Sequence, residues 1–133
     1  MTRGERNNNP GNIRRVAGVT WEGENSDQSG DDAFVVFVSV EYGIRAMARI
    51  LLSYAREGLN TVATIIDRWA PPNENNSAVY VKDVCATCGV GPGKHIYVPY
   101  FMPWLIRGII QHENDQVIYT DQQIAEGIAL ANT

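Results

Sequence analysis

The spacing of apolar residues divides the chain into a polar, turn-rich beginning and a long remainder with helical periodicity. From Ser39 onward, apolar residues recur every three or four positions, which is the period of an amphipathic helix. Gly58, the pair Pro71-Pro72 and Gly89 interrupt the pattern where helices commonly stop. The candidate helix-capping residues are Ser39, Asn60 or Thr61, Ser77, and Thr120 with Gln123. The pattern predicts about five helices within residues 39–131.

The first 38 residues show short apolar runs between turn signals instead. Residues 1–11 are polar and rich in asparagine, and they end in the turn signal Asn9-Pro10-Gly11. An acidic, glycine-containing stretch, residues 23–32, separates the last two runs. The predicted extended segments are residues 12–16, 19–22 and 34–38. They indicate a small antiparallel sheet over about residues 12–38, which must pack against the helices because it is too small to be stable alone.

Together these patterns predict an α+β fold, mainly helical with a small antiparallel sheet. The 133 residues suffice for a single domain, residues 1–133, with its own core. The net charge of −4 argues against a nucleic-acid partner, and no apolar run approaches the roughly 18 residues needed to span a membrane. The first residues carry no apolar signal region, so we expect no Sec-type export address.

Cys85 and Cys88 form a lone CxxC motif. A structural zinc site needs four ligands, and the sequence offers neither a second cysteine pair nor a histidine pair of suitable spacing. Both cysteines continue the helical spacing of Tyr80, Val81 and Val84. We therefore expect core-facing structural thiols, and no metal or other cofactor.

Glu113 carries the strongest functional signal in the sequence. It follows Ile109 and Ile110 by one turn of an apolar helical stripe, where a charged side chain is costly unless the protein uses it. Desolvation at such a position favours the neutral acid, which suits a group that donates a proton near neutral pH. The alternative is a helix-end carboxylate that simply reaches solvent. His112 flanks the same stripe and is either an orienting group or an ordinary surface histidine.

Other segments carry side chains suited to a sugar chain. Amides donate and accept hydrogen bonds, as hydroxyl and acetamido groups require, and aromatic faces stack on sugar rings. The candidate substrate-binding residues are His112, Asn8, Asn9, Asn12, Trp21, Glu22, Trp69 and Asn73. The opposing interpretation is that the asparagines satisfy their own turns and that the tryptophans belong to the core.

Four strings of the sequence carry a family resemblance. They are RGERNNNPGNI at residues 3–13, FVSVEYGIRAMA at 37–48, RWAPPNEN at 68–75 and QHEN at 111–114. On these strings the chain resembles a family of small phage and prophage proteins described as virion structural or lysozyme-like proteins. The resemblance implies a location in the phage virion or the host cell, action at the bacterial periplasm or cell wall, and other virion proteins as partners.

A more distant resemblance implies a mechanism. The string LIRGIIQHEN at residues 105–114 resembles the helix of lytic transglycosylases that ends in their catalytic glutamate, with Asn114 where those enzymes usually carry serine. Residues 8–13, Trp21 with Gly23, and residues 34–39 with the helix that follows resemble the sheet region of bacterial glucosaminidases of the lysozyme superfamily. Because the glutamate helix precedes the sheet in those enzymes, the two resemblances together imply a circularly permuted lysozyme-like domain.

The expected function is cleavage of peptidoglycan by a phage lytic enzyme, with the glycan strand as partner. The resemblance implies that Glu113 protonates the glycosidic oxygen between N-acetylmuramic acid and N-acetylglucosamine. A hydrolase needs a second carboxylate, and the candidates are Glu5, Glu22, Glu24 and Asp27. None of them stands out, which favours a lytic transglycosylase, where one glutamate both donates and accepts the proton. The alternative is a non-catalytic virion or wall-binding protein.

Overall fold

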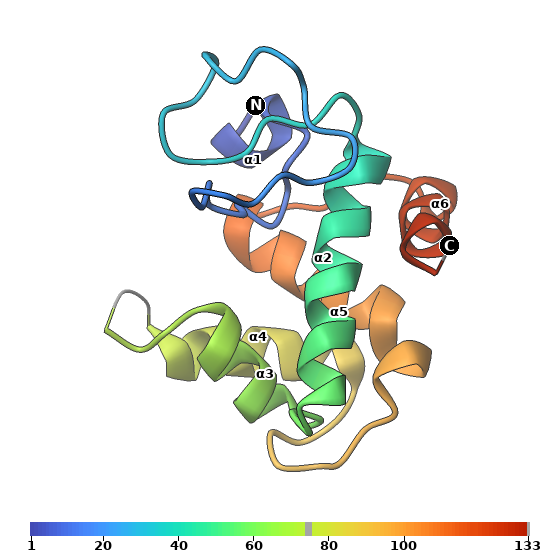
Figure 1. The fold of residues 1–133 in the computed structure, drawn as a ribbon. Helices are drawn as coiled ribbons and strands as arrows, with labels where there is room; N and C mark the ends of the chain where they lie inside the picture. The colour runs from blue at the N-terminus through green and yellow to red at the C-terminus, as the bar shows by residue number, and fades with distance from the viewer. Residues whose placement is uncertain (74–75, 133) are drawn as a thin grey trace.

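Six helices joined by irregular segments make up the chain in the computed structural model, which describes residues 1–73 and 76–132 (Figure 1). The helices are α1 (Arg3–Arg6), α2 (Val40–Arg56), α3 (Val62–Trp69), α4 (Ser77–Cys88), α5 (Val98–Asn114) and α6 (Asp121–Ala131). Glu74 and Asn75, which belong to the amide-rich loop after Trp69, lie outside the described residues, as does Thr133.

The predicted α+β fold is wrong, because residues 12–38 form no sheet in the described chain. This segment contributes two isolated antiparallel bridges, Arg14 with Phe34 and Glu24 with Phe37. The fold is therefore all-helical. The expectation of a circularly permuted lysozyme-like domain falls with the sheet, since the comparison with the glucosaminidases depended on it.

Side-chain amides and a few backbone bonds together hold residues 12–38 in place. The fully buried Asn9 amide donates to the carbonyl oxygens of Ile13 and Val35 and accepts from the Ile13 N–H, each at 2.9 Å. The Gln28 side chain binds both the N–H and the carbonyl oxygen of Val36, at 2.9 and 2.7 Å. Backbone bonds also cross the segment, from the Val35 N–H to the Ile13 carbonyl oxygen and from the Arg15 N–H to the Ala33 carbonyl oxygen, but they stop at isolated bridges and do not extend into a ladder.

The helical prediction for the rest of the chain is confirmed. Ser39 is the N-cap of α2, and Thr61 caps α3 in a capping box with Thr64. Thr120 and Gln123 form the predicted capping box at the start of α6. Each box satisfies backbone N–H groups that would otherwise have no partner in the first turn.

Two helix starts differ from the prediction. The N-cap of α4 is Asn76 rather than Ser77, although the helix ends as expected at Gly89, which is left-handed with φ of 69°. The short helix α1 is additional: Thr2 accepts from the Glu5 N–H while the Glu5 carboxylate accepts from the Thr2 N–H. This T-x-x-E capping box was visible in the sequence and would have identified α1.

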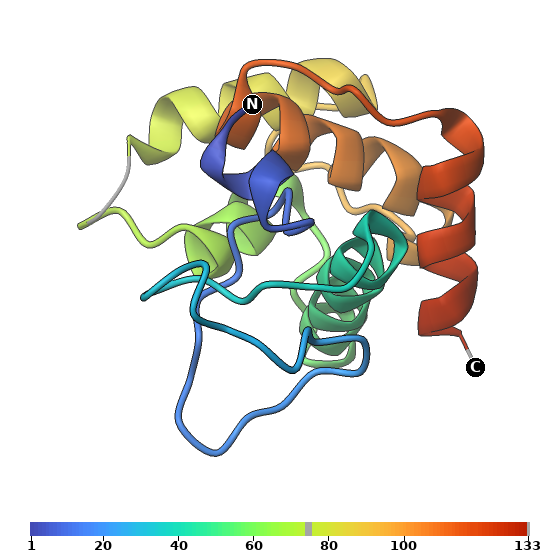
Figure 2. The same cartoon turned by 90° about the horizontal axis from the view of Figure 1, so that it is seen from above.

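Helix α2 packs against α6 and α5, and α4 packs against α5 and α3 (Figures 1 and 2). Helices α6 and α2 approach each other closely at Gly127, where a Cβ atom would lie 2.6 Å from the Ile44 side chain of α2. The largest fully buried side chains are Tyr80, Phe37, Ile44, Met47, Leu51, Ile65, Ile66, Met102, Leu105, Ile106, Ile109 and Ile110.

The N-terminal segment, residues 1–39, covers one end of α2, and α3 and α4 lie toward the other (Figure 1). Its asparagine-rich turn presses directly on α2, because a Cβ atom at Gly43 would lie 2.0 Å from the carbonyl oxygen of Asn8. The Asn8 side chain, on a backbone with φ of 52°, donates to the Phe37 carbonyl oxygen at 3.1 Å. The turn is therefore part of the packed structure.

Asp31 anchors this segment through five hydrogen bonds. Its buried carboxylate accepts two from the Arg3 guanidinium at 2.6 and 2.7 Å and one from the Asn7 amide at 2.8 Å. The N–H groups of Ala33 and Phe34 each donate at 2.9 Å. These donors, with Arg3 the strongest, hold the pKa of Asp31 well below its usual range. The carboxylate thus ties α1 to the loop before Phe34.

Candidate functional site

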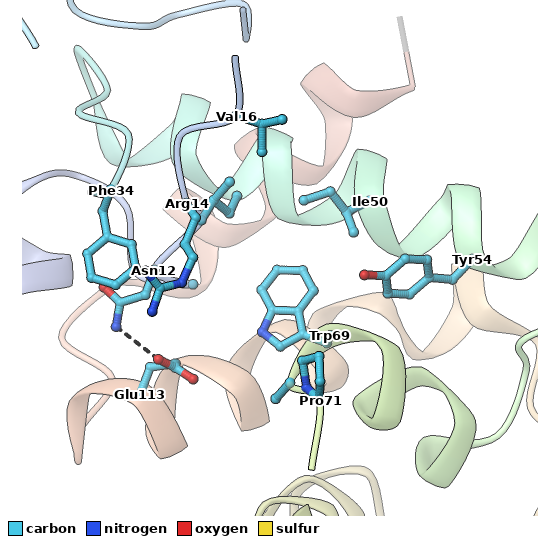
Figure 3. Close-up of a pocket in the computed structure, with 12 residues that line it drawn as sticks. Asn12, Arg14, Val16, Phe34, Ile50, Tyr54, Trp69, Pro71 and Glu113 are labelled. Atoms are coloured by element: carbon cyan, nitrogen blue, oxygen red, sulfur yellow. Dashed lines mark hydrogen bonds between the residues drawn. The ribbon is translucent and has the colours of Figure 1, made fainter. Parts of the chain in front are cut away.

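A cleft of about 430 Å³ lies between the N-terminal segment and the end of α3, and Glu113 is one of the residues that line it (Figure 3). One side comes from the N-terminal segment: Gly11, Asn12, Ile13, Arg14, Val16 and Phe34. The other side comes from α2 and from the end of α3: Ile50, Tyr54, Trp69, Ala70 and Pro71. The volume lies in the range of ordinary small-molecule sites, and the walls combine aromatic faces with a few polar groups.

Glu113 is the penultimate residue of α5, but it does not continue the buried apolar stripe as predicted. Leu105, Ile106, Ile109 and Ile110 are fully buried, but the stripe continues into Asn114, which is 3 % exposed, and Glu113 lies at its flank, only partly buried. The Asn114 amide donates to the carbonyl oxygens of Pro10 and Ile110. Asn114 therefore fills the core position, which leaves the neighbouring carboxylate facing the cleft.

Both oxygens of Glu113 are held by neutral donors. The Asn12 amide donates to Oε1 at 2.9 Å, and the Tyr80 hydroxyl donates to Oε2 at 2.8 Å. Asn12 comes from the N-terminal turn and Tyr80 from α4, so three distant parts of the sequence meet at this carboxylate. Its orientation is consequently set by the tertiary structure.

Tyr80 is a fixed hydrogen-bond donor. Burial, and then the neighbouring Glu113 charge, raise its pKa far above the ordinary value, so the hydroxyl keeps its proton. The Tyr80 ring stacks on His112 with centroids 3.7 Å apart, and His112 Nδ1 lies 2.8 Å from Asp83 Oδ2. His112 therefore packs against Tyr80, whose hydroxyl donates to Glu113, and is not among the residues that line the cleft.

The Asn12 backbone is left-handed, with φ of 51°, a conformation that asparagine tolerates better than most residues. The Asn12 Nδ2 is committed to Glu113, while its buried Oδ1 has no hydrogen-bond partner in the described structure. A buried polar atom without a partner costs free energy. The Asn12 amide therefore binds Glu113 through Nδ2 while its Oδ1 stays buried without a hydrogen bond.

The structure brings three of the predicted site residues together, namely Glu113, Asn12 and Trp69. The others lie outside the cleft lining: His112, Asn8, Asn9, Trp21, Glu22 and Asn73. Asn8 and Asn9 bind backbone carbonyl groups, as the opposing interpretation of the asparagine-rich turn proposed. Trp21 packs against the hydrophobic core.

Glu113 supplies the sole carboxylate among the described residues that line the cleft. Glu22 pairs with Arg45 at 2.9 Å, and the Glu24 carboxylate accepts from the Trp21 N–H. Glu5 belongs to the α1 capping box and accepts from Gln116, and Asp27 accepts from the Ser29 N–H. Each of the other candidate acids is thus bonded to a protein group outside the cleft lining.

Sequence reasoning did not identify Tyr80, Tyr54, Phe34 or Arg14 as site residues. Tyr80 appeared as one apolar position of a helix, and no local signal shows that its hydroxyl meets Glu113. Arg14 and Phe34 belong to a segment that was predicted to be a sheet. Instead of a sheet, their backbones form an isolated antiparallel bridge.

The two cysteines are free and partly buried against the core, on the last turn of α4. Burial raises the pKa of Cys85, and burial with the neighbouring thiol raises that of Cys88 to about 11. Since the thiolate is the reactive form, both are poor nucleophiles at neutral pH. No group of three or more potential metal ligands occurs among the described residues, and no described helix is long and apolar enough to cross a membrane.

Cys85→Ala is expected to lower the free energy of unfolding by about 1 kcal/mol, because it removes a partly buried side chain without touching the cleft. Urea denaturation measures this effect, and any activity of the folded variant should equal that of the wild type at low temperature. An activity that responds to a chelator or to a reductant would contradict the structural role.

The described cleft belongs to a protein of a phage family. No family model matches the chain. The chain is 38 % identical over 128 residues to Protein P5 of Pseudoalteromonas phage PM2, and the match covers 94 % of this chain and 79 % of that protein. At this identity and coverage the chain belongs to the Protein P5 family. The expected relationship to phage proteins is confirmed, whereas the lysozyme-like part of that expectation gains no support from the comparison.

Proposed function

We propose that this protein binds a glycan strand of bacterial peptidoglycan in the cleft and cleaves it, with Glu113 as the general acid. The observation that carries the proposal is the position of Glu113: a partly buried carboxylate in an open cleft, oriented by Asn12 and Tyr80. An acid oriented in this way is the minimal requirement for protonating a glycosidic oxygen. Trp69 lies across the cleft from the carboxylate and supplies a face for a sugar ring (Figure 3).

The neighbours of Glu113 suit both of its protonation states. Tyr80 donates to the carboxylate form. The Asn12 amide carries a donor and an acceptor, so rotation of the amide lets it bind either the carboxylate or the protonated acid. Glu113 can then give up a proton and take one back without losing its partners.

A single carboxylate favours transglycosylase-like chemistry over hydrolysis. A hydrolase of the usual kind needs a second carboxylate within about 5–9.5 Å of the first. The described cleft lining offers Glu113 alone. We propose that Glu113 protonates the leaving oxygen and then accepts the proton of the muramyl 6-hydroxyl as that oxygen attacks the anomeric carbon, which forms an anhydro product.

A second candidate function is a non-catalytic virion protein that binds the wall. Two observations favour it: the chain belongs to a phage protein family, and both oxygens of Glu113 are already bonded within the protein. A structural carboxylate is bonded in the same way. Under this proposal the cleft binds the glycan strand, and the bond is not broken.

One experiment separates the two candidates. Purified protein is incubated with peptidoglycan sacculi, and the soluble products are analysed by mass spectrometry while the bound protein is measured by co-sedimentation. Anhydro-muramyl products support the transglycosylase, and products with reducing ends support a hydrolase. Co-sedimentation without products supports the non-catalytic protein, and the absence of both results overturns the peptidoglycan proposal.

A further inference from the structure

Arg14 lines the cleft but takes no part in the proton transfer proposed for Glu113. Its side chain is exposed, and it reaches into the cleft beside Phe34 on the same side as Asn12 and Glu113 (Figure 3). The Arg14 guanidinium carbon lies 5.0 Å from the centroid of the Phe34 ring. Such stacking orients the planar group at low cost in side-chain entropy.

Arg3 is a second cation beside the Phe34 ring, and it differs from Arg14 because it is paired with carboxylates. Arg3 lies 4.4 Å from the ring centroid, and its charge is compensated by Asp31 at 2.6 Å and Asp32 at 3.2 Å. Arg14 forms no ion pair with any described carboxylate. It is thus an oriented cation, with its hydrogen-bond donors available, at the wall of a concave site.

We infer that Arg14 recognises a carboxylate on the bound saccharide, so that the cleft prefers an acidic sugar chain to a neutral one. This inference rests on the proposed function, since it assumes that the cleft binds a glycan. A guanidinium binds a carboxylate through two parallel hydrogen bonds, which a neutral N-acetylglucosamine chain cannot offer. Trp69 and Tyr54 form the opposite side, where the uncharged faces of the sugar rings can pack.

Two groups of peptidoglycan present such a carboxylate. One is the lactyl group of N-acetylmuramic acid in strands without peptides, and the other is a carboxylate of the stem peptide attached to that lactyl group. Both offer Arg14 the same chemistry, so the ligands in the experiment must distinguish them.

The test measures binding by isothermal titration calorimetry in a Glu113→Gln background, where the ligand is not cleaved. The ligands are glycan strands stripped of peptides, strands that keep their stem peptides, and neutral oligomers of N-acetylglucosamine. Arg14→Gln is expected to weaken binding of at least one acidic ligand by about tenfold or more, because a charge-assisted pair is lost. Its affinity for the neutral oligomer should stay within about twofold of the background.

Arg56→Gln is the matched control, because it removes the same charge from an exposed position at the end of α2 outside the cleft lining. It should bind every ligand as the background does. Arg14→Lys should recover part of the affinity, since it keeps the charge and loses the planar pair of donors. Circular dichroism confirms that each variant is folded.

The outcomes distinguish this inference from the proposed function. An equal loss of affinity for acidic and neutral ligands in Arg14→Gln, or no loss for any ligand, overturns the role of Arg14 and leaves the glycan cleft intact. Absence of binding by the Glu113→Gln background to all three ligands, with no binding by the wild type, overturns both. Which acidic ligand responds identifies the lactyl group or the stem peptide as the source of the carboxylate.

Discussion

Glu113→Gln is expected to leave the protein folded and to reduce peptidoglycan cleavage by about 10²–10⁴-fold. The amide has nearly the shape of the carboxylic acid and keeps a carbonyl oxygen for the Tyr80 hydroxyl. It cannot donate the proton that the leaving glycosidic oxygen needs. Turbidity of permeabilised Gram-negative cells measures the rate of lysis, and mass spectrometry of the digest verifies that the same bond is involved.

Tyr80→Phe provides the companion variant for the same carboxylate. It keeps the ring that stacks on His112 and removes the hydroxyl that orients Glu113. We expect a fall in kcat with little change in KM, because the substrate contacts remain and the acid loses a fixed donor.

Lysis by Glu113→Gln at the wild-type rate would exclude Glu113 as the general acid, and the acid would then have to be Glu5 or a residue of the acidic loop, residues 23–32.

Asp31→Asn is expected to destabilise the protein by about 1–3 kcal/mol at pH 7, the usual cost of leaving buried donors without their acceptor. The substitution removes the charge that Arg3 binds and turns an NH₂ group toward donors that need an acceptor. Asp32→Asn is the matched control. Asp32 pairs with the same arginine at 3.2 Å, but its side chain is 97 % exposed, so its loss should have little effect.

The difference in the free energy of unfolding between the wild type and Asp31→Asn should depend on pH. The pKa of Asp31 in the folded protein lies well below the value of about 3.9 expected in the unfolded chain. Its contribution is therefore fully present above about pH 4–5 and is lost as the pH falls toward the folded value. Urea denaturation at pH 7 and at pH 3 measures both variants. A difference that grows on acidification would show that the carboxylate is not the stabilising group.

The helical part of the fold was predictable because its signals are local. Each helix beyond Ser39 repeats its apolar residues with the helical period, and residues such as Thr61 and Thr120 cap helix starts through hydrogen bonds that span three positions. The error over residues 12–38 has the opposite origin. Asn9 binds the backbone of Val35 from 26 positions away, and Gln28 binds that of Val36 from 8 positions away, so the local sequence pattern does not predict these bonds.

The local pattern of residues shows that Glu113 lies near the end of an apolar helix and that amide-rich turns occur elsewhere in the chain. The surroundings of the Glu113 carboxylate, in contrast, follow from the tertiary structure. It placed Asn114 in the core, which left Glu113 facing the cleft, and it brought Asn12 and Tyr80 to the two oxygens from 101 and 33 positions away. It also set Arg14 on Phe34 at the same wall. The physical reason is that helix periodicity depends on near neighbours, whereas a site depends on contacts between segments that only packing of the whole chain brings together.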